Sequence, residues 1–253
     1  MTAKTERKRL DMLLVERGLA DSSHKAQAMI LAGEVEVEQQ RADKAGLILP
    51  QTAHIEVHSR QQKYASRGGV KLEGALEDFR VSAAGMVCLD IGASTGGFTD
   101  CLLQNGAARV YAVDVNTDQM AWKLREDRRV AGIEKNARAL QSEDLPELAD
   151  LVAVDVSFIS VAKVLPGAAA CAKPGADLLI LIKPQFELKR EEVGQGGIVR
   201  EKELHERAIA SVRHAAEKLG LSVLGVAPSH LPGAEGNQEY FLHARKLAKV
   251  ESR

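Results

Sequence analysis

Four charged side chains border apolar runs that have the composition of buried strands. Asp155 follows Leu-Val-Ala-Val, Lys183 follows Leu-Leu-Ile-Leu-Ile, Glu239 precedes Tyr-Phe-Leu, and Lys71 precedes the first such run. A charge at the end of a buried strand needs a partner or a chemical purpose, because burying an unpaired ion is costly. The candidate catalytic residues are therefore Lys71, Asp155, Lys183 and Glu239.

Two lysines and two carboxylates suit the deprotonation of a hydroxyl. A lysine that is desolvated near a second cation can act as a general base, and the carboxylates would balance the charge. Methyl transfer depends chiefly on positioning the two reactants, and a ribose hydroxyl becomes a good nucleophile once a base removes its proton. We therefore expect these four residues to serve the methylation of a ribose hydroxyl. A base-amine methyltransferase would need a proline-containing loop where the chain has Asp155-Val156-Ser157-Phe158, and Cys171 lacks the setting of a carbon-5 nucleophile. Purely structural ion pairs are the alternative for each charged residue.

A glycine-rich segment follows the apolar run at 87–91. Such a turn between a strand and a helix lets the backbone approach a ligand. Ser94 replaces the second glycine of the dinucleotide pattern G-x-G-x-x-G and would crowd a pyrophosphate. Asp114 ends the next strand, where a carboxylate can accept hydrogen bonds from both hydroxyls of an adenosine ribose. An adenosine cofactor without a pyrophosphate fits better than NAD, with a structural strand–turn–helix as the alternative. The predicted loop contacts are Asp90, Gly92, Ala93, Ser94, Thr95, Gly96, Gly97 and Phe98.

Strands and helices alternate from residue 87 onward. Apolar runs predict strands at 87–91, 110–115, 151–156 and 178–183, and helices at 97–105, 117–126, 160–172 and 201–219. Two strands, 221–229 and 239–245, follow without a helix between them. Strands with no polar face indicate a mostly parallel sheet covered by helices. The carboxyl ends of neighbouring strands then meet in one crevice, which should bring Asp155 beside Lys183. Glu239 begins an antiparallel strand and should lie at the same edge.

The first part of the chain predicts a small α+β module. Two short helices within 9–33 end at Gly18 and Gly33, and strands follow at 35–37 and 53–57. A polar turn is expected at 39–41. Gln39-Gln40 lacks the residues that favour positive φ, so the turn should differ from an Asn-Gly hairpin. Glu34, Glu36 and Glu38 would make this edge a poor surface for RNA.

Composition limits the partners and the compartment. The 253 residues are 45% apolar and 27% charged with a net charge of -1, so nucleic acid would bind through local patches. Cys88, Cys101 and Cys171 have no short spacing and predict free thiols. No apolar run approaches the ~18–20 residues that span a bilayer, and no signal-peptide pattern appears, so we expect a cytoplasmic protein. Because lysines supply the positive charge, no metal is expected.

The motifs together resemble a known family. The segments SRGGVKLEGAL, LDIGASTGGFTDCLL, VDVSFIS, LIKPQFE and GNQEYFLH occur in the order typical of the TlyA family, a branch of the FtsJ-like ribose methyltransferases. The resemblance implies S-adenosyl-L-methionine as cofactor and a cytidine ribose in ribosomal RNA as substrate. It also implies that Lys183 is the base, that Lys71 holds the target nucleotide, and that Asn136 approaches the adenine. The short chain ends favour 23S rRNA, with 16S rRNA as the alternative.

The resemblance also implies a domain order. Residues 8–66 resemble an S4 RNA-binding domain, 67–73 are expected to form a junction, and 74–250 a Rossmann-like class I methyltransferase domain with an antiparallel last strand. The expected partner is ribosomal RNA or a ribosomal subunit, without DNA or membrane. Two rival functions are a non-catalytic ribosome-assembly factor and a haemolysin, a label that the family carries. Predicted RNA contacts are Arg9, Arg17, His24, Lys25 and Arg67.

Overall fold

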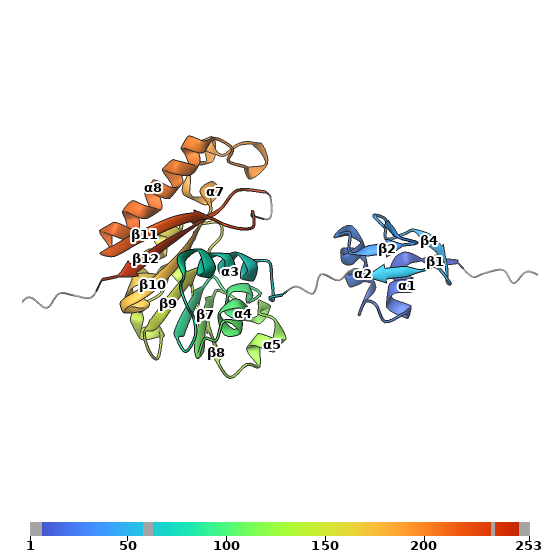
Figure 1. The fold of residues 1–253 in the computed structure, drawn as a ribbon, viewed down its shortest axis with the longest axis horizontal. Helices are drawn as coiled ribbons and strands as arrows, with labels where there is room; N and C mark the ends of the chain where they lie inside the picture. The colour runs from blue at the N-terminus through green and yellow to red at the C-terminus, as the bar shows by residue number, and fades with distance from the viewer. Residues whose placement is uncertain (1–6, 58–62, 234–235, 248–253) are drawn as a thin grey trace, which may run out of the picture. The chain divides into compact units, whose positions relative to one another are not determined.

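The computed structural model describes residues 7–57, 63–233 and 236–247. It divides into two compact units, an N-terminal unit, Met1–Gln62, and a C-terminal unit, Lys63–Arg253 (Figure 1). Each unit has a hydrophobic core of its own.

The N-terminal unit packs two helices against short strands. Its helices are α1 (Leu10–Glu16) and α2 (Ser23–Leu31), and its strands are β1 (Arg7–Arg9), β2 (Val35–Val37), β3 (Gln40–Arg41), β4 (Ile48–Pro50) and β5 (Ile55–Val57). Ser22 begins α2 by accepting a hydrogen bond from the backbone N–H of Lys25 at 3.2 Å. Gly18 and Gly33 follow the helix ends with φ of 69° and 71°. The predicted helices and both of their glycine ends are therefore confirmed.

The hairpin of this unit differs from the prediction. Strands β2 and β3 pair antiparallel, and Glu38 and Gln39 join them with φ of 49° and 65°. Positive φ at both central residues is the type I′ arrangement of an Asn-Gly hairpin, so the expectation of another turn type was wrong. Gln40 belongs to a strand and not to the turn. The backbone N–H of Glu38 donates to the carbonyl of His54 at 3.0 Å, and its carboxylate accepts from the His54 N–H at 2.9 Å. These contacts to the segment before β5 offset the cost of the backbone conformation.

The C-terminal unit is built on a seven-stranded sheet in the order β11-β12-β10-β9-β6-β7-β8. Neighbours pair in parallel from β10 to β8, and β12 is antiparallel to both β10 and β11. This confirms the predicted α/β fold with an antiparallel last strand. The strands are β6 (Val87–Ile91), β7 (Arg109–Asp114), β8 (Val130–Glu134), β9 (Ala149–Val154), β10 (Ala172–Ile182), β11 (Leu221–Pro228) and β12 (Tyr240–Lys246).

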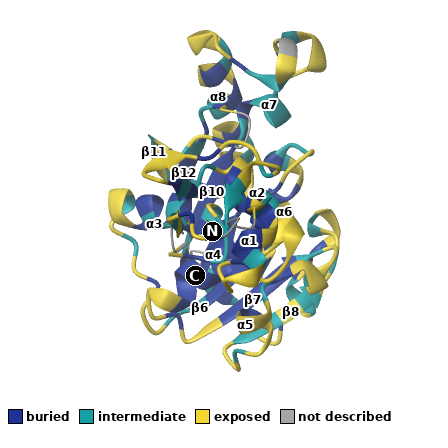
Figure 2. Ribbon diagram, turned by 90° about the vertical axis from the view of Figure 1, so that its right-hand side faces the viewer, coloured by how far each residue is buried: buried dark blue, intermediate teal, exposed yellow. Residues whose placement is uncertain are grey.

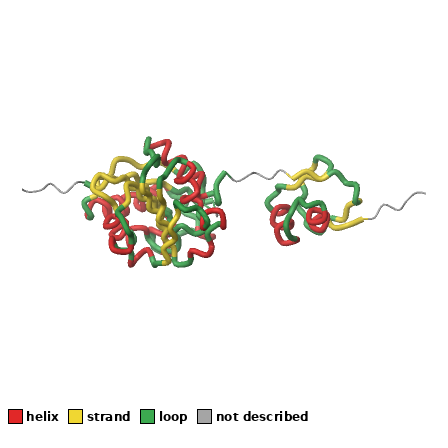
Figure 3. Tube along the Cα trace, turned by 90° about the horizontal axis from the view of Figure 1, so that it is seen from below, coloured by secondary structure: helices red, strands yellow, loops and turns green. Residues whose placement is uncertain are grey.

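Helices cover both faces of this sheet, as Figure 3 shows for its yellow strands. Leu89 and Ile91 of β6 face the cluster that includes residues of α6 and α8, whereas Cys88 faces the cluster with α3 and α4. Because both faces are covered, β6 and β7 are mostly buried (Figure 2). The helices are α3 (Gly68–Phe79), α4 (Gly97–Gln104), α5 (Trp122–Arg125), α6 (Leu165–Cys171), α7 (Pro184–Glu187) and α8 (Lys202–Lys218).

The largest difference from the sequence expectation lies at the predicted junction, 67–73. Residues 68–73 form the start of α3 instead, and the division between the units lies earlier, after Gln62. Leu72, Ala75 and Leu76 of this helix are buried. Packing of this apolar face against α4 stabilises a helix whose glycines disfavour it locally.

Three further elements differ in detail. The expected helix over 117–126 is a 3-10 turn, Thr117–Gln119, followed by the short α5. Met120 between them has an extended backbone, and its buried side chain packs against Gly96. The expected helix over 160–172 is likewise a 3-10 turn, Val161–Lys163, followed by α6 with a proline in its first turn. The half-buried edge strand β8 was missing from the predicted strands. Among the residues described, no helix is both long and apolar enough to cross a membrane.

Candidate active site

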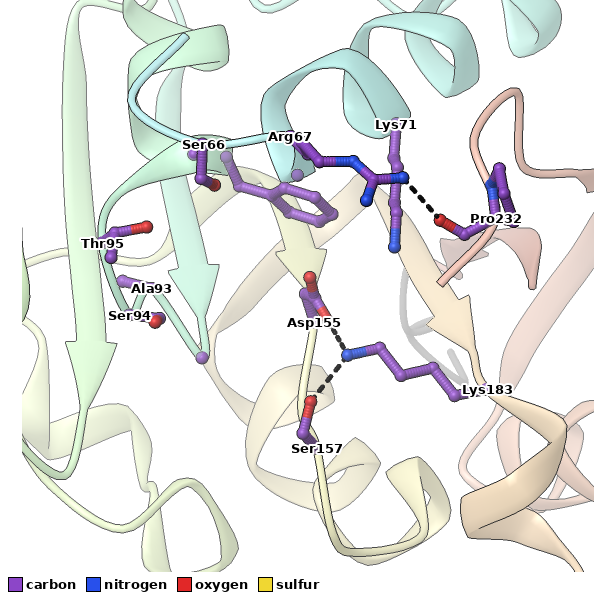
Figure 4. Close-up of a pocket in the computed structure, with 14 residues that line it drawn as sticks. Ser66, Arg67, Lys71, Ala93, Ser94, Thr95, Asp155, Ser157, Lys183 and Pro232 are labelled. Carbon is purple, nitrogen blue, oxygen red and sulfur yellow. Dashed lines mark hydrogen bonds and ion pairs between the residues drawn. The ribbon is translucent and has the colours of Figure 1, made fainter. Parts of the chain in front are cut away.

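Lys183 and Asp155 form the first of two ion pairs at the carboxyl edge of the sheet. Asp155 follows β9 and Lys183 follows the neighbouring β10, as the sequence predicted. Lys183 Nζ lies 2.5 Å from Asp155 Oδ1 and donates to Ser157 Oγ at 2.7 Å (Figure 4). The amine of Lys183 is therefore held by two groups of one loop.

Lys71 and Glu239 form the second pair. Lys71 belongs to α3, Glu239 directly precedes β12, and Lys71 Nζ donates to Glu239 Oε2 at 2.6 Å. Both side chains are buried, with 11% of Lys71 and 3% of Glu239 exposed. The backbone fixes Glu239 as well, because its carbonyl accepts from the N–H of Ser229 at 2.8 Å. The four predicted charged residues thus form two lysine–carboxylate pairs.

One cavity of about 240 Å³ receives side chains of both pairs. Lys71, Asp155 and Lys183 line it, whereas Glu239 lies behind Lys71. Arg67 also lines it and donates to the carbonyl of Pro232 at 3.4 Å (Figure 4). The other lining residues are Ser66, Gly68, Gly92, Ala93, Ser94, Thr95, Gly97, Phe98, Ser157 and Pro232.

The glycine-rich loop between β6 and α4 forms one wall of this cavity. Gly92 has a φ of 89°, and a Cβ there would overlap the carbonyl oxygen of Asp155. A Cβ at Gly97 would likewise overlap the hydroxyl of Ser66. Ser94 adopts a φ of 47°, and its N–H donates to Asp114 Oδ2 at 2.9 Å. The glycines therefore allow the loop to lie directly against two other segments of the site.

A second cavity of about 460 Å³ adjoins the first, since Gly92, Ser94, Asp155 and Ser157 line both. Asp114 and Asn136, the two predicted contacts of the adenosine, line it. The Asn136 side chain accepts a hydrogen bond from the N–H of Arg138 at 3.0 Å and so begins the 3-10 turn Ala137–Ala139. Asn136 thus also shapes the backbone of this wall.

Two further predicted loop residues are buried. Asp90 lies beneath the loop, where its Oδ2 accepts from Thr99 Oγ1 at 2.6 Å. Its Oδ1 has no hydrogen-bond partner within the described part of the chain. Burial raises the pKa of Asp90 to about 7. The Phe98 ring lines the first cavity and stacks on Phe241 at a centroid distance of 6.1 Å.

The predicted RNA contacts of the N-terminal unit fall into two groups. Arg9 makes two hydrogen bonds, of 3.0 and 2.7 Å, to the carboxylate of buried Asp11. Arg17 donates to the carbonyls of Ala53 and Gln51 at 2.8 and 2.5 Å. Both arginines thus hold the domain together, whereas His24 and Lys25 are exposed on α2.

Several residues at the site were absent from the sequence prediction. Ser157 and Ser66 line the first cavity, and Phe158 and Ile159 line the second. Ser157 lies two residues after Asp155 in the VDVSFIS segment, which was a usable signal. Phe158 is 88% exposed and has a φ of 66°, which no local pattern indicates for an aromatic residue.

Known proteins share this architecture and sequence. A protein-family model described as FtsJ-like methyltransferase matches residues 64–246, and the S4 domain model matches residues 8–55. A Mycobacterium tuberculosis protein named 16S/23S rRNA (cytidine-2′-O)-methyltransferase TlyA is 47% identical over 94% of this chain and 90% of its own length. Hemolysin A of Brachyspira hyodysenteriae is 41% identical over 93% of this chain and 98% of its own.

A solved structure agrees with these relatives. A Streptococcus thermophilus protein, described under a hemolysin name, has a TM-score of 0.75 and 40% identity, covering 96% of this chain and 90% of its own. The family models, the relatives and the site geometry agree along nearly the whole chain. The chain therefore belongs to the TlyA branch of the FtsJ-like methyltransferase family.

Proposed function

We propose that this protein transfers a methyl group from S-adenosyl-L-methionine to the 2′-hydroxyl of a cytidine in ribosomal RNA. The observation that best supports this reaction is the pair of lysine–carboxylate contacts, Lys183–Asp155 and Lys71–Glu239, at one cavity beside the glycine-rich loop. The substrate named for the M. tuberculosis relative supports the choice of RNA.

The residues of the two adjoining cavities fit the cofactor. Gly92 and Gly97 let the loop that lines the first cavity lie against Asp155 and Ser66, and Asp114 offers a carboxylate to ribose hydroxyls from the second cavity. Asn136 lies in the same wall and would approach the adenine. S-adenosyl-L-methionine, when bound, supplies an electrophilic methyl group. Asp90 would act from beneath, by holding the loop through Thr99.

Lys183 would accept the proton of the ribose hydroxyl at its Nζ. Asp155 and Ser157 orient that amine, and both residues line the two adjoining cavities. Lys71 would hold the target nucleotide through its positive charge, and Glu239 fixes the Lys71 side chain. A correctly placed base accelerates such a step by about 10²–10⁴-fold.

RNA would be held by the S4-type N-terminal unit and by Arg67 at the edge of the first cavity. His24 and Lys25 are the exposed candidates for phosphate contact, whereas Arg9 and Arg17 would contribute only their remaining N–H groups. We expect the large-subunit RNA as target and a cytoplasmic location.

The direct test combines labelled cofactor with ribosomal RNA, free and in each subunit, and maps 2′-O-methylation by reverse transcription. Lys183→Ala should lose about 10²–10⁴-fold in rate. Cofactor binding, measured by calorimetry, should persist in this variant. Lys202→Ala, which removes an exposed lysine on α8, is the control and should keep full activity.

Three outcomes would contradict the proposal. Undiminished activity of Lys183→Ala would remove the proposed base. Label on a nucleobase would overturn the reaction class. A wild-type protein that binds ribosomal RNA but no cofactor would favour a non-catalytic assembly factor.

A further inference from the structure

The short helix α7 and the residue before it contact the loop between Asp155 and Val161, here called the catalytic loop, at two points. Lys183 immediately precedes α7, and its amine contacts Asp155 and Ser157. Glu187 is the last residue of α7 and contacts the other end of the same loop, which runs from Asp155 to Val161. The five residues from Lys183 to Glu187 thus contact the loop at both of its ends.

Both carboxylate oxygens of Glu187 are used in this contact. Ser160 Oγ donates to Oε2 at 2.6 Å, and the N–H of Val161 donates to Oε1 at 2.7 Å. Burial raises the pKa of Glu187, and the two donors oppose that shift. Loss of this acceptor would be costly, because Val161 is buried and its N–H would be left unpaired.

The loop between the two contacts has a backbone conformation that it would not hold alone. Phe158 has a φ of 66° although it is neither glycine nor asparagine. Its ring is 88% exposed and contacts only the Phe186 ring among the aromatic residues described, at 5.4 Å. Such a conformation persists where the surrounding structure holds it from both sides. The Asp155 N–H bond to Ile91, at 2.9 Å, holds the first side, and Glu187 holds the second.

We propose that Glu187 is a positioning residue for the methyl transfer reaction, which keeps Asp155 and Ser157 in register with the amine of Lys183. This role rests on the proposed function of the site. Glu187 lines neither cavity among the residues described, so it acts through the loop and does not touch the reacting groups.

The test compares Glu187→Ala with Glu187→Gln. Glutamine keeps an oxygen for the Val161 N–H, and its amide can donate to the Ser160 hydroxyl, so both contacts can form without the charge. Alanine removes both. Asp150→Ala is the matched control, because Asp150 also accepts from one backbone N–H (Val87, 3.0 Å) and one side chain (Lys173, 2.8 Å), but at the amino end of β9.

Glu187→Ala should lower kcat about 100-fold, the cost of a misplacement of about 1 Å, with KM for RNA changed less than about 3-fold. Glu187→Gln should remain within about 3-fold of wild type, since it keeps both contacts. Asp150→Ala should lose stability but keep its kcat. A Glu187→Ala kcat within 3-fold of wild type, or an equal loss in Asp150→Ala, would overturn the positioning role.

A second measurement separates this role from the proposed function. Hydrogen exchange of the full chain, followed in the peptide covering 155–163, should be faster in Glu187→Ala than in wild type or Glu187→Gln. Unchanged exchange would overturn the contact's role in holding the loop. A wild type without any methyl transfer but with faster exchange in Glu187→Ala would instead contradict the proposed function alone.

Discussion

The buried pair of Lys71 and Glu239 allows stability and activity to be separated. Lys71→Met leaves the Glu239 carboxylate buried without its cation, 2.6 Å from where the amine stood. Removing one partner of a buried pair costs about 3–5 kcal/mol, because the remaining charge is uncompensated. For a domain of about 150–250 residues, each kcal/mol lowers the unfolding midpoint by about 2–4 °C, so we expect a loss of roughly 6–20 °C.

The double variant Lys71→Met with Glu239→Met provides the decisive comparison. Two unbranched apolar side chains of similar length remove both charges, and such replacements are often neutral or stabilising. We expect the free energy of unfolding of the double variant to lie within about 1 kcal/mol of the wild-type value. Neither the single nor the double variant should transfer methyl groups. Calorimetric unfolding and the labelled-cofactor assay measure the two properties on the same samples. A single variant that loses less than about 1 kcal/mol, or a double variant as unstable as Lys71→Met, would refute the reasoning.

Two further predictions concern the buried acid and the hairpin. Burial raises the pKa of Asp90 to about 7, whereas its value in the unfolded chain is near 3.9. The folded state therefore binds the proton more tightly than the unfolded state does. As a result, the contribution of Asp90 to stability falls as pH rises from about 4 to about 7. Asp90→Asn should therefore gain in unfolding temperature relative to wild type between pH 5 and pH 8, and an equal difference at both pH values would contradict this. Gln39→Gly should stabilise the N-terminal unit by up to about 1 kcal/mol, because glycine accepts the φ of 65° without strain. Gln40→Gly in β3 is the control and should destabilise the N-terminal unit by about 0.5–1 kcal/mol. Hydrogen exchange over 35–41 would show whether the first variant slows exchange and the second speeds it.

Much of the sheet could be predicted from short patterns. Val87–Ile91 and its neighbours are apolar on both faces, and this composition follows from burial between two layers of helices. The turn at Gly92 was recognisable because a close approach to the carbonyl of Asp155 admits no side chain. The juxtaposition of Asp155 and Lys183 followed from topology, since the carboxyl ends of adjacent parallel strands share one edge.

Other features depended on contacts between distant segments. Helix α3 lies where a junction was expected over 67–73, and its burial against α4 decides its conformation. The hairpin adopts positive φ at Glu38 and Gln39 because His54, in the segment before β5, holds Glu38. Arg9 and Arg17 were predicted as RNA contacts from their charge, but their hydrogen bonds to Asp11 and to backbone carbonyls appear only in three dimensions.

The sequence by itself determined the strand pattern, the glycine-rich loop and the identity of the four charged residues. Each of these is encoded within a few neighbouring positions, by periodicity or by a residue type that burial demands. Only the tertiary structure decided that Lys71 pairs with Glu239, 168 residues away. It also brought Lys183 into contact with Ser157 and Glu187 into contact with Ser160, because hydrogen bonds between separate segments depend on packing that no local pattern records.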